Sequence, residues 1–446
     1  DDSQVIKRIA ECISHMSPDD TTLQKVSRIA ARNWRLRNQP RLLIDVTQLA
    51  KSDARTGIQR VVRNIAYEIV GLEGMQCPVE LVHQVDGTLW RASKVIGSIF
   101  DIPASSVPEQ QIVIHPGDTL LMIDSSWEQY RGFLPIFQTV RELGGKIVTV
   151  IYDIIPLRTP ELCVPALVTV FRTWFRLAVE ESDTLLCISR ATADEVKIYL
   201  NEQNIQQRRR LSVLHWPLGG DIAVRTTETA VREPVRQMAA DNSSPLFLMV
   251  GTLEPRKGHQ FTLDAFEELW RNGSNVRLCI AGSVGWIDTK TIEQIRNHPL
   301  LNTKLFFVES FTDAEIEICY AAATALIAAS VAEGFGLPIV EAALHNVPTL
   351  ASDIPVFREV GGDGARYFSL ADSRYLAEAV IEFSTLTPQE RLGMAAKIRT
   401  VTWRQSAERL LSAIGLKNNT GNLSSSGCQV ASESINVIVS SDRSYS

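Results

Sequence analysis

The chain has 446 residues, 45% of them hydrophobic, and a formal net charge of −6. This length exceeds one ordinary hydrophobic core and predicts two domains of about 150–200 residues each. The negative balance argues against general nucleic-acid binding, because that function needs a positively charged surface.

The basic residues, cysteines and histidines form few clusters. The densest basic tract, QQRRRLS at residues 206–212, is either a contact for anionic lipid or phosphate or the solvated end of a helix. The seven cysteines are scattered without a C-x-x-C pair, which indicates a reducing compartment. The histidines, including His259 and His345, follow no metal-binding pattern, so no metal is expected.

The apolar segments do not predict a membrane span. The best apolar run, residues 321–332, is too short to cross a bilayer and predicts the end of a helix followed by a buried strand. No signal peptide is recognisable. The chain begins with Asp1, and residues 417–446 are rich in Ser, Asn and Gly. We therefore expect a mobile tail and a chain that is one module of a larger protein.

The first half alternates short apolar runs with amphipathic segments. Residues 1–39 are predicted to form a polar helical extension that ends at Pro40, and residues 40–225 a first domain. Within this domain, buried strands are predicted at residues 41–46, 118–124, 146–156 and 183–189, and the segment at residues 210–218 closes this half. Helices are predicted between them at residues 56–70, 133–145 and 190–200.

The second half repeats the same alternation after a polar linker at residues 226–244, and forms a second domain over residues 245–401. Its strands are predicted at residues 245–252, 276–283, 304–310, 325–330 and 347–352. Its helices are predicted at residues 258–273, 290–298, 313–323 and 338–346. Residues 402–416 are expected to form a C-terminal helix that packs back toward the first domain.

This alternation of short, nearly continuous apolar strands with helices predicts the α/β class. Strands of this kind form parallel sheets covered by helices on both faces. The sequence therefore predicts two doubly wound, Rossmann-like domains that face a cleft. Ligands of such sheets bind beyond the carboxyl ends of the strands.

The segment EGFGLPIVE, from Glu333 to Glu341, lies at such a strand end. Gly334 and Gly336 let the backbone approach a ligand closely, and the helix that follows offers unpaired N–H groups to an anion, most simply phosphate. Glu333 and Glu341 are then suited to accept hydrogen bonds from the hydroxyls of a sugar or ribose. The alternative is a helix cap with a surface glutamate.

A second loop at the same edge contains Arg256 and Lys257, in GTLEPRKG. The two cations follow the first strand of the second domain, and Gly258 enters a helix. They are suited to neutralise a departing nucleoside diphosphate. The alternative is a solvated loop.

The first domain contributes three candidates to the cleft. Gly57 precedes a helix, where backbone N–H groups can reach across. Asp153 lies at the carboxyl end of a central strand, and its alternative role is to cap the turn before Ile154-Ile155-Pro156. Trp127 lies at a similar strand end and either stacks on a sugar face or belongs to the core.

Several of these segments together resemble one enzyme family. They are TGIQR, YDIIPLRTPE, CISRATADEV, GTLEPRKG, FTDAEIEICYAAA and EGFGLPIVE, spread over residues 41–416. The chain thereby resembles the retaining glycosyltransferases of family 4, which have the GT-B fold. The E-x7-E pattern is specific when it follows an R-K-G loop at this distance. The combination of TGI-R with D-IPL--PE looks most like the bacterial mannosyltransferases that build O-antigen polysaccharide.

The resemblance implies a role for each donor-side residue. Arg256 and Lys257 would bind the diphosphate of a nucleotide sugar, and Gly57 would lie near the phosphates. Glu333 would hydrogen-bond the sugar hydroxyls, and Glu341 the ribose. The remaining implied contacts are made by the backbone of Gly334, Phe335, Gly336 and Leu337 to sugar and phosphate, and by residues 311–313 to the base.

The chain departs from the family in two places. Tyr152 stands where the family usually has a histidine placed near the sugar. The tyrosine hydroxyl is expected to keep a hydrogen bond there, but it cannot carry the charge of a histidine. Gln59 replaces the second glycine of T-G-I-G-R, which reshapes the acceptor side. Tyr152, Trp127 and Arg60 are the acceptor-side candidates.

The implied activity is transfer of mannose from GDP-mannose to a lipid-linked polysaccharide, with retention and without a metal or cofactor. The implied place is the cytoplasm, at the inner face of the cytoplasmic membrane, with a peripheral membrane or protein contact. Three alternatives stay open: a UDP-sugar-dependent transferase of the same fold, a non-catalytic GT-B scaffold, and a nucleotide-sugar 2-epimerase.

Overall fold

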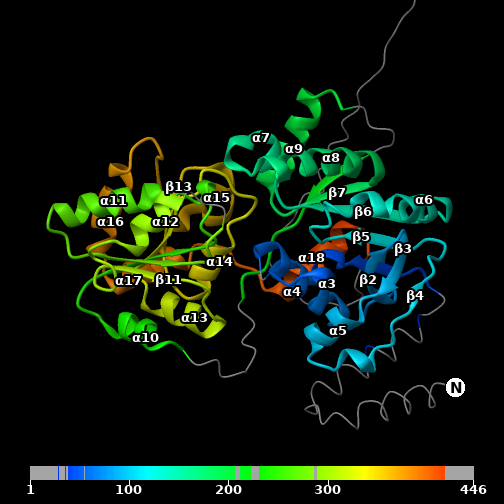
Figure 1. Ribbon diagram of the computed structural model, residues 1–446, viewed down its shortest axis with the longest axis horizontal. Helices are drawn as coiled ribbons and strands as arrows, with labels where there is room; N and C mark the ends of the chain where they lie inside the picture. The colour runs from blue at the N-terminus through cyan, green and yellow to red at the C-terminus, as the bar shows by residue number, and fades with distance from the viewer. Residues whose placement is uncertain are drawn as a thin grey trace, which may run out of the picture.

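The computed structural model describes residues 29, 36, 39–54, 56–205, 211–221, 231–285 and 289–416. Most of the expected N-terminal extension, the basic tract at 206–210 and the expected tail at 417–446 lie outside these residues. The described chain folds into two α/β domains that lie side by side (Figure 1). This arrangement confirms the predicted fold class.

The first domain is built on an eight-stranded sheet in the order β4-β3-β2-β1-β5-β6-β7-β8. Its strands are β1 (Leu42–Asp45), β2 (Val79–Val85), β3 (Thr88–Arg91), β4 (Gln111–Ile112), β5 (Thr119–Met122), β6 (Lys146–Ile151), β7 (Thr184–Cys187) and β8 (Ser212–His215). Its helices are α3 (Thr47–Lys51), α4 (Gly57–Gly71), α5 (Ser93–Phe100), α6 (Leu134–Glu142), α7 (Ile155–Arg158), α8 (Pro165–Glu181) and α9 (Arg190–Glu202).

This sheet is not wholly parallel, which corrects the prediction. β3 runs antiparallel to both β2 and β4. Asp86 and Gly87 make the tight turn between β2 and β3 with φ of 46° and 79°. Two positive φ values in succession are typical of the hairpin turn that an Asp-Gly pair favours.

The second domain has a six-stranded sheet in the order β11-β10-β9-β12-β13-β14, in which every pair is parallel. Its strands are β9 (Leu246–Val250), β10 (Arg277–Ala281), β11 (Leu305–Val308), β12 (Ala325–Ala328), β13 (Thr349–Ser352) and β14 (Ala365–Phe368). Its helices are α10 (Glu233–Ala240), α11 (His259–Arg271), α12 (Thr289–Arg296), α13 (Asp313–Ala322), α14 (Leu337–Leu344), α15 (Pro355–Gly361), α16 (Arg374–Ser384) and α17 (Pro388–Ala395).

The expected linker at residues 226–244 contains the helix α10, which corrects the sequence-based boundary. Val235 and Met238 on this helix are buried in the core. The guanidinium of Arg232, just before α10, pairs with Glu315 on α13 at 2.7 Å. Residues 232–240 therefore pack as part of the second domain.

The last described helix, α18 (Trp403–Ala413), crosses back to the first domain and lies beside α4 (Figure 1). The backbone N–H of Trp403 donates to Asp221 Oδ1 at 2.6 Å, and its indole N–H donates to the Asp221 carbonyl at 2.9 Å. Trp216 donates its indole N–H to Ser406 Oγ at 3.2 Å. These contacts fix the point at which the chain returns between the domains. Among the described residues, every helix is too short or too polar to cross a bilayer.

Two buried carboxyl groups lie at the carboxyl ends of the neighbouring strands β1 and β5. Asp45 accepts hydrogen bonds from Thr47 and Ser126, and Asp124 accepts one from the backbone N–H of Leu49 at 2.7 Å. Burial, and then the charge of Asp124, raise the pKa of Asp45 to about 7. The folded protein therefore holds a proton on Asp45 at pH values where an unfolded chain has lost it.

We expect this pair to lower the stability of the protein as the pH rises from about 4 to about 7. In that window the folded state binds more protons than the unfolded state, so the free energy of unfolding falls, by up to about 1.4 kcal/mol per pH unit from Asp45 alone. Asp45→Asn imitates the protonated form and should flatten this fall. Urea midpoints measured from pH 4 to pH 8 test it, with the exposed Asp363→Asn as control. Parallel curves for Asp45→Asn and the unmodified protein would contradict the assignment.

Candidate functional site

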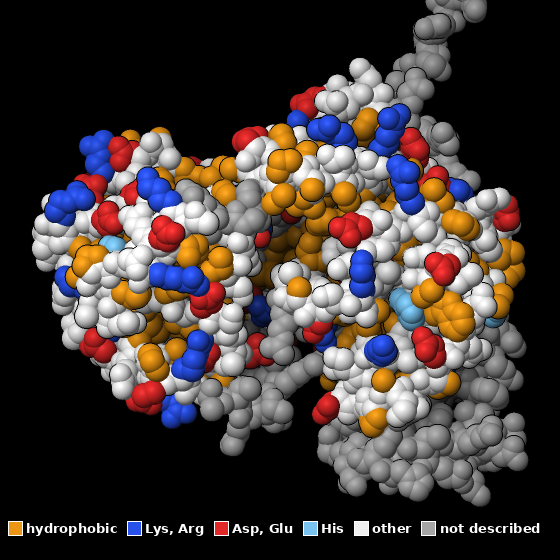
Figure 2. All heavy atoms as spheres, in the orientation of Figure 1, with side chains coloured by type: hydrophobic (Ala, Val, Ile, Leu, Met, Phe, Trp, Pro, Cys, Tyr) orange, Lys and Arg blue, Asp and Glu red, His pale blue; other side chains and the backbone are white. Residues whose placement is uncertain are grey.

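The two loops singled out in the second domain follow neighbouring strands. The PRKG loop follows β9, the EGFG loop follows β12, and β9 pairs directly with β12. The chain runs outward from β9 through β10 and β11, and in the other direction from β12 through β13 and β14. The loops therefore lie at the topological switch point, where such sheets bind ligands. Figure 2 shows the surface hollowed between the two domains.

Glu333 is held by two cations and a hydroxyl. Its Oε2 lies 2.9 Å from Nη1 of Arg256, and its Oε1 pairs with Nζ of Lys257. Ser330 Oγ donates to Oε1 at 2.8 Å. Burial acts to raise the pKa of Glu333, but the charges of Arg256 and Lys257 outweigh it and lower the pKa to about 2. Glu333 is thus a carboxylate at working pH and cannot serve as a general acid.

Arg256 joins three carboxylates around the same point. Its Nε lies 2.9 Å from Glu254, and its charge also acts on Asp153 of the first domain. Burial raises the pKa of Asp153, and Arg256 opposes that rise. Asp153 Oδ1 accepts the backbone N–H of Ile155 at 3.0 Å, so it does cap the turn before α7. Its Oδ2 has no hydrogen-bond partner among the described residues, and remains open to a ligand hydroxyl.

The loop between the two glutamates has free backbone donors. Within the described part of the chain, nothing accepts a hydrogen bond from the backbone N–H of Gly334, Phe335 or Gly336. Gly336 has φ of 103°, and a β-carbon there would come within 2.9 Å of the Phe357 ring. Gly334, Phe335 and Gly336 are all buried in this structure. Leu337 begins α14 directly after these free N–H groups.

Glu341 is nearly fully buried and bridges the domains. Its Oε1 lies 2.6 Å from Nη1 of Arg60 on α4, and its Oε2 accepts the hydroxyl of Tyr320 at 2.8 Å. The charge of Glu341 is the main reason that the pKa of Arg60 is raised. Arg60, which the sequence assigned to the acceptor side, therefore pairs with Glu341, which the sequence assigned to the ribose. The sequence also suggested Asp313 near the base, and its charge acts on Arg60 as well.

Two other acceptor-side candidates lie elsewhere. The Tyr152 hydroxyl donates to the carbonyl of Ile123 at 2.7 Å, inside the first domain, which corrects the expectation that it bonds the sugar. The Trp127 ring packs at 5.2 Å from the ring of Phe171, within an aromatic cluster. These contacts agree with the alternative that Trp127 belongs to the hydrophobic core.

Gly57 is the exposed first residue of α4, with open space where a side chain would be. Thr56 caps the helix, and Gln59 completes a reciprocal capping box with it. Gln59 is buried, and its amide also donates to the Ser52 carbonyl at 2.6 Å. The glutamine that departs from the family pattern thus fixes the shape of the loop before Gly57.

Three contact residues were missed by sequence reasoning. Ser189 and Thr192, at the start of α9, and Glu359 on α15 join the two domains beside the EGFG loop. The signal available was Ser189 itself, a helix N-cap directly after a buried strand, within CISRATADEV.

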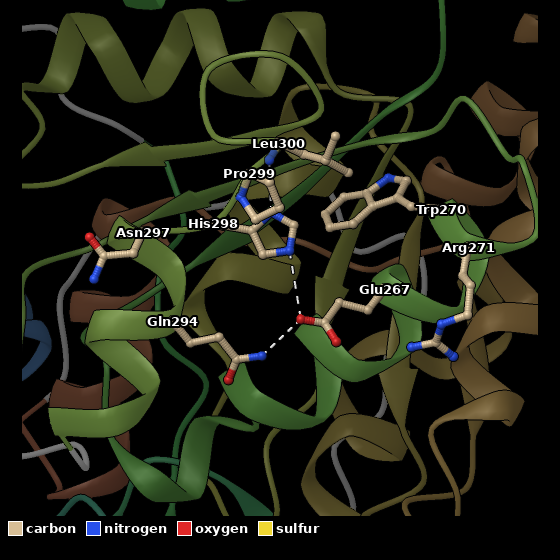
Figure 3. A pocket seen from close by; sticks show the side chains of 8 residues that line it. All are labelled: Glu267, Trp270, Arg271, Gln294, Asn297, His298, Pro299 and Leu300. Carbon is tan, nitrogen blue, oxygen red and sulfur yellow. Dashed lines mark hydrogen bonds and ion pairs between the residues drawn. The ribbon is translucent and has the colours of Figure 1, made fainter.

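A separate hollow of about 410 Å³ lies on the second domain between α11 and α12 (Figure 3). The Glu267 carboxylate accepts the amide of Gln294 at 2.8 Å, and His298 Nδ1 accepts the N–H of Leu300 at 3.1 Å. These polar groups are already paired, and none belongs to the loops at the switch point. The described residues contain no group of three or more His, Cys, Asp or Glu side chains arranged to hold a metal ion.

Comparison with known proteins agrees with this geometry. Residues 232–399 match the family described as "Glycosyl transferases group 1". The chain is 36% identical over 387 residues to the serotype-specific mannosyltransferase WbdA of Escherichia coli, covering 85% of this chain and 46% of that protein. It therefore spans about half the length of this relative. It is also 26% identical over 243 residues to the O-antigen chain mannosyltransferase RfbU of Salmonella typhimurium, covering 54% of this chain and 62% of that one.

Two solved structures share the architecture. Sucrose-phosphate synthase of Thermosynechococcus elongatus superposes with a TM-score of 0.55 at 13% identity, over 84% of this chain and 98% of that one. The Anabaena protein HepE, solved in complex with UDP and glucose, gives 0.55 at 16% identity, over 84% of this chain and 100% of that one.

The two α/β sheets give the chain the GT-B fold, and the two loops lie at the topological switch point of its second domain. The second domain belongs to the glycosyl transferases group 1 family, and the chain as a whole resembles the O-antigen mannosyltransferases.

Proposed function

We propose that this chain transfers mannose from GDP-mannose to a growing polysaccharide, with retention of the anomeric configuration. The observation that carries the proposal is the Glu333 carboxylate, held ionised by Arg256 and Lys257 beside a loop with free backbone donors. A sugar diphosphate is complementary to this site: the carboxylate accepts hydrogen bonds from its sugar hydroxyls, and the two cations and the unpaired N–H groups bind its phosphates.

Each donor group has a partner in this site. Arg256 and Lys257 bind the diphosphate, and the backbone of residues 334–337 contacts phosphate and sugar. Glu333 accepts hydrogen bonds from sugar hydroxyls. Glu341, oriented by Tyr320, accepts from the ribose. Gly57 approaches the phosphates from the first domain.

The chemical step transfers the glycosyl group on one face of the sugar. The acceptor hydroxyl oxygen forms a bond to the anomeric carbon as the bond from that carbon to the diphosphate oxygen breaks, through an oxocarbenium-like transition state. The electron pair of the broken bond stays on the diphosphate, and the acceptor proton passes to a diphosphate oxygen. Arg256 and Lys257 stabilise the charge that develops there. Asp153 accepts a hydrogen bond from a ligand hydroxyl through its free Oδ2.

The choice of mannose rests on the relatives named as mannosyltransferases, WbdA above all. By the same likeness the acceptor is an O-antigen-type polysaccharide on a lipid carrier, reached from the cytoplasmic face of the membrane through a peripheral contact. The donor is a substrate, and no cofactor or metal takes part in the proposal. A UDP-sugar is the alternative donor, because the cations recognise the diphosphate rather than the base.

The first experiment is turnover of GDP- and UDP-sugars, with and without a mannose-terminated oligosaccharide. Acceptor-dependent release of GDP from GDP-mannose supports the proposal, and NMR of the product then tests retention. Turnover of a UDP-sugar instead overturns the donor but keeps the site. No transfer from any donor would favour the non-catalytic scaffold.

The Tyr320 hydroxyl is expected to act on donor binding alone. Tyr320→Phe removes one hydrogen bond to the Glu341 carboxylate and should raise the donor KM about tenfold while kcat changes little, since a hydrogen bond to a charged group is worth about 1.5–3 kcal/mol. The control is Tyr367→Phe, which removes a hydroxyl that donates to Gly362 and Phe357 in the same domain. An unchanged KM in Tyr320→Phe would remove Glu341 from the donor site.

A further inference from the structure

The amino end of α9 in the first domain is hydrogen-bonded to the EGFG loop of the second domain. Ser189 Oγ donates to the carbonyl oxygen of Gly334 at 2.7 Å, and Thr192 Oγ1 donates to the same oxygen at 3.1 Å. Ser189 and Thr192 are almost completely buried. Ser189 also accepts the backbone N–H of Thr192 at 3.0 Å and so caps the helix. Two hydroxyls of one domain thus converge on one carbonyl of the other.

The second domain contributes the carboxylate of Glu359 to the same contact. Glu359 on α15 accepts the backbone N–H of Arg190 at 2.8 Å with one oxygen and that of Ala191 at 2.7 Å with the other. These two N–H groups belong to the first turn of α9, where a helix has unpaired donors and favours negative charge. Glu359 therefore satisfies the first two N–H groups of α9 across the domain boundary, while Ser189 satisfies the third within the first domain. In the other direction, the Ser189 and Thr192 hydroxyls satisfy one carbonyl of the second domain.

The EGFG loop is also in direct contact with the first domain on its other side. A β-carbon on Gly334 would overlap the carbonyl oxygen of Tyr152 and lie 3.3 Å from Cβ of Asp153. The loop thus fits between the end of β6 and the start of α9. Glu333, one residue earlier, is thereby brought into the electrostatic range of Asp153.

We infer that the amino end of α9 is the docking site that sets the EGFG loop for transfer, with Ser189, Thr192 and Glu359 as positioning residues. This inference rests on the proposed function, because it assigns these residues to the reaction of the same site. They touch the loop and not the sugar.

The physical link is the planarity of one peptide group. In a trans peptide the carbonyl and the following N–H point in opposite directions, and the described residues contain no cis peptide. Holding the Gly334 carbonyl on α9 therefore directs the N–H of Phe335 away from α9. That N–H is one of the free donors of the loop. The docked domains thus fix the direction of a donor that the proposed sugar diphosphate needs.

The first test removes the hydroxyls and keeps the volume. Thr192→Val combined with Ser189→Ala should lower kcat at least tenfold with little change in the donor KM, because the docked state is lost and the second domain still binds donor. Thr192→Ser alone keeps the hydroxyl group and should therefore keep most of the activity. Thr387→Ala is the matched control, since Thr387 caps α17 within the second domain. It should lower the melting temperature and leave kcat unchanged.

The second test measures docking without activity. Glu359→Gln should weaken the carboxylate contact to α9 and increase the radius of gyration in small-angle X-ray scattering, while Asp353→Asn, which removes an exposed ion pair with Arg358, should not. A shift in scattering together with lower kcat supports the inference. Variants that lose only melting temperature, with kcat and scattering as in the unmodified protein, overturn it. If the unmodified protein transfers no sugar, the proposed function fails, and scattering still decides whether α9 docks the loop.

Discussion

Replacing Glu333 with glutamine is expected to lower kcat for sugar transfer by about 10²–10³-fold, the usual cost of removing one preorganised polar group at a reacting centre. Glutamine has nearly the same shape but loses the charge that Arg256 and Lys257 hold in place. It presents an N–H₂ group where a sugar hydroxyl needs an acceptor, and leaves both cations without their shared partner. Initial rates at saturating donor, compared with donor binding by calorimetry, separate the chemical step from affinity.

Glu254→Gln is the matched control, because Glu254 is the other close carboxylate partner of Arg256 and does not pair with Lys257 in the structure. It should cost much less than Glu333→Gln. Equal losses would mean that Glu333 acts only by holding Arg256. Full activity in Glu333→Gln, with the melting temperature unchanged, would remove Glu333 from the site.

The same residue has a consequence for pH. The pKa of Glu333 is lowered to about 2, after the cations overcome the opposing effect of burial. Its contribution to stability is therefore complete above the unfolded value of about 4.3 and is lost as the pH falls from there toward 2. Any acidic limb of a rate profile above pH 5 must come from another group, and Asp153, whose pKa is raised, is the candidate in the cleft.

The parts of the fold that the sequence predicted are those whose signals are local. A run such as IVTVI at residues 147–151 predicts a buried strand, and Thr56 with Gln59 marks the start of α4 by a capping box. The hairpin between β2 and β3 was missed although its Asp86-Gly87 turn is a strong local signal. Helix α10 was missed because its short amphipathic pattern lies in a polar segment.

The contacts between the two domains could not be predicted from the sequence, for a different reason. Arg60 and Glu341 are 281 positions apart, and Ser189 and Gly334 are 145 apart, so no periodicity connects them. Strand order brings loops of one sheet together, but it does not say which loop of the other domain meets them. The sequence therefore placed Glu333, Arg256 and Lys257 at one edge, but it did not predict the ion pair between Arg60 and Glu341.

The site has two parts: groups that lie within the second domain, and groups of the first domain that reach them across the domain boundary. The cations, Glu333 and the free N–H groups, which hold the donor in the proposed function, belong to the second domain alone. Asp153, Arg60 and the start of α9 reach that donor site only across the boundary. Donor affinity and turnover should therefore respond to different residues, and one glycine at the boundary can separate them.

Gly334→Ala is expected to lower kcat more than a hundredfold while the second domain still binds the donor nucleotide. Gly334 does not have a positive φ, so alanine is compatible with its backbone conformation. The obstacle is the carbonyl oxygen of Tyr152, which the new β-carbon would overlap. Backbone on both sides of this contact cannot move aside cheaply, so the domains must separate or the loop must shift, and either change withdraws Glu333 from Asp153. A near-attack geometry displaced by about 1 Å costs about 10²-fold in rate.

The control for this substitution is Gly393→Ala in α17, a glycine without positive φ that has open space around its β-carbon position. It should match the unmodified protein in rate and be slightly more stable, because alanine favours a helix by about 1 kcal/mol over glycine. Calorimetry with GDP and single-turnover rates should then show near-normal affinity and a slow chemical step in Gly334→Ala. A normal rate would mean that transfer proceeds with the EGFG loop away from Tyr152. A loss of GDP affinity as large as the loss of rate would mean that the glycine shapes the donor pocket itself.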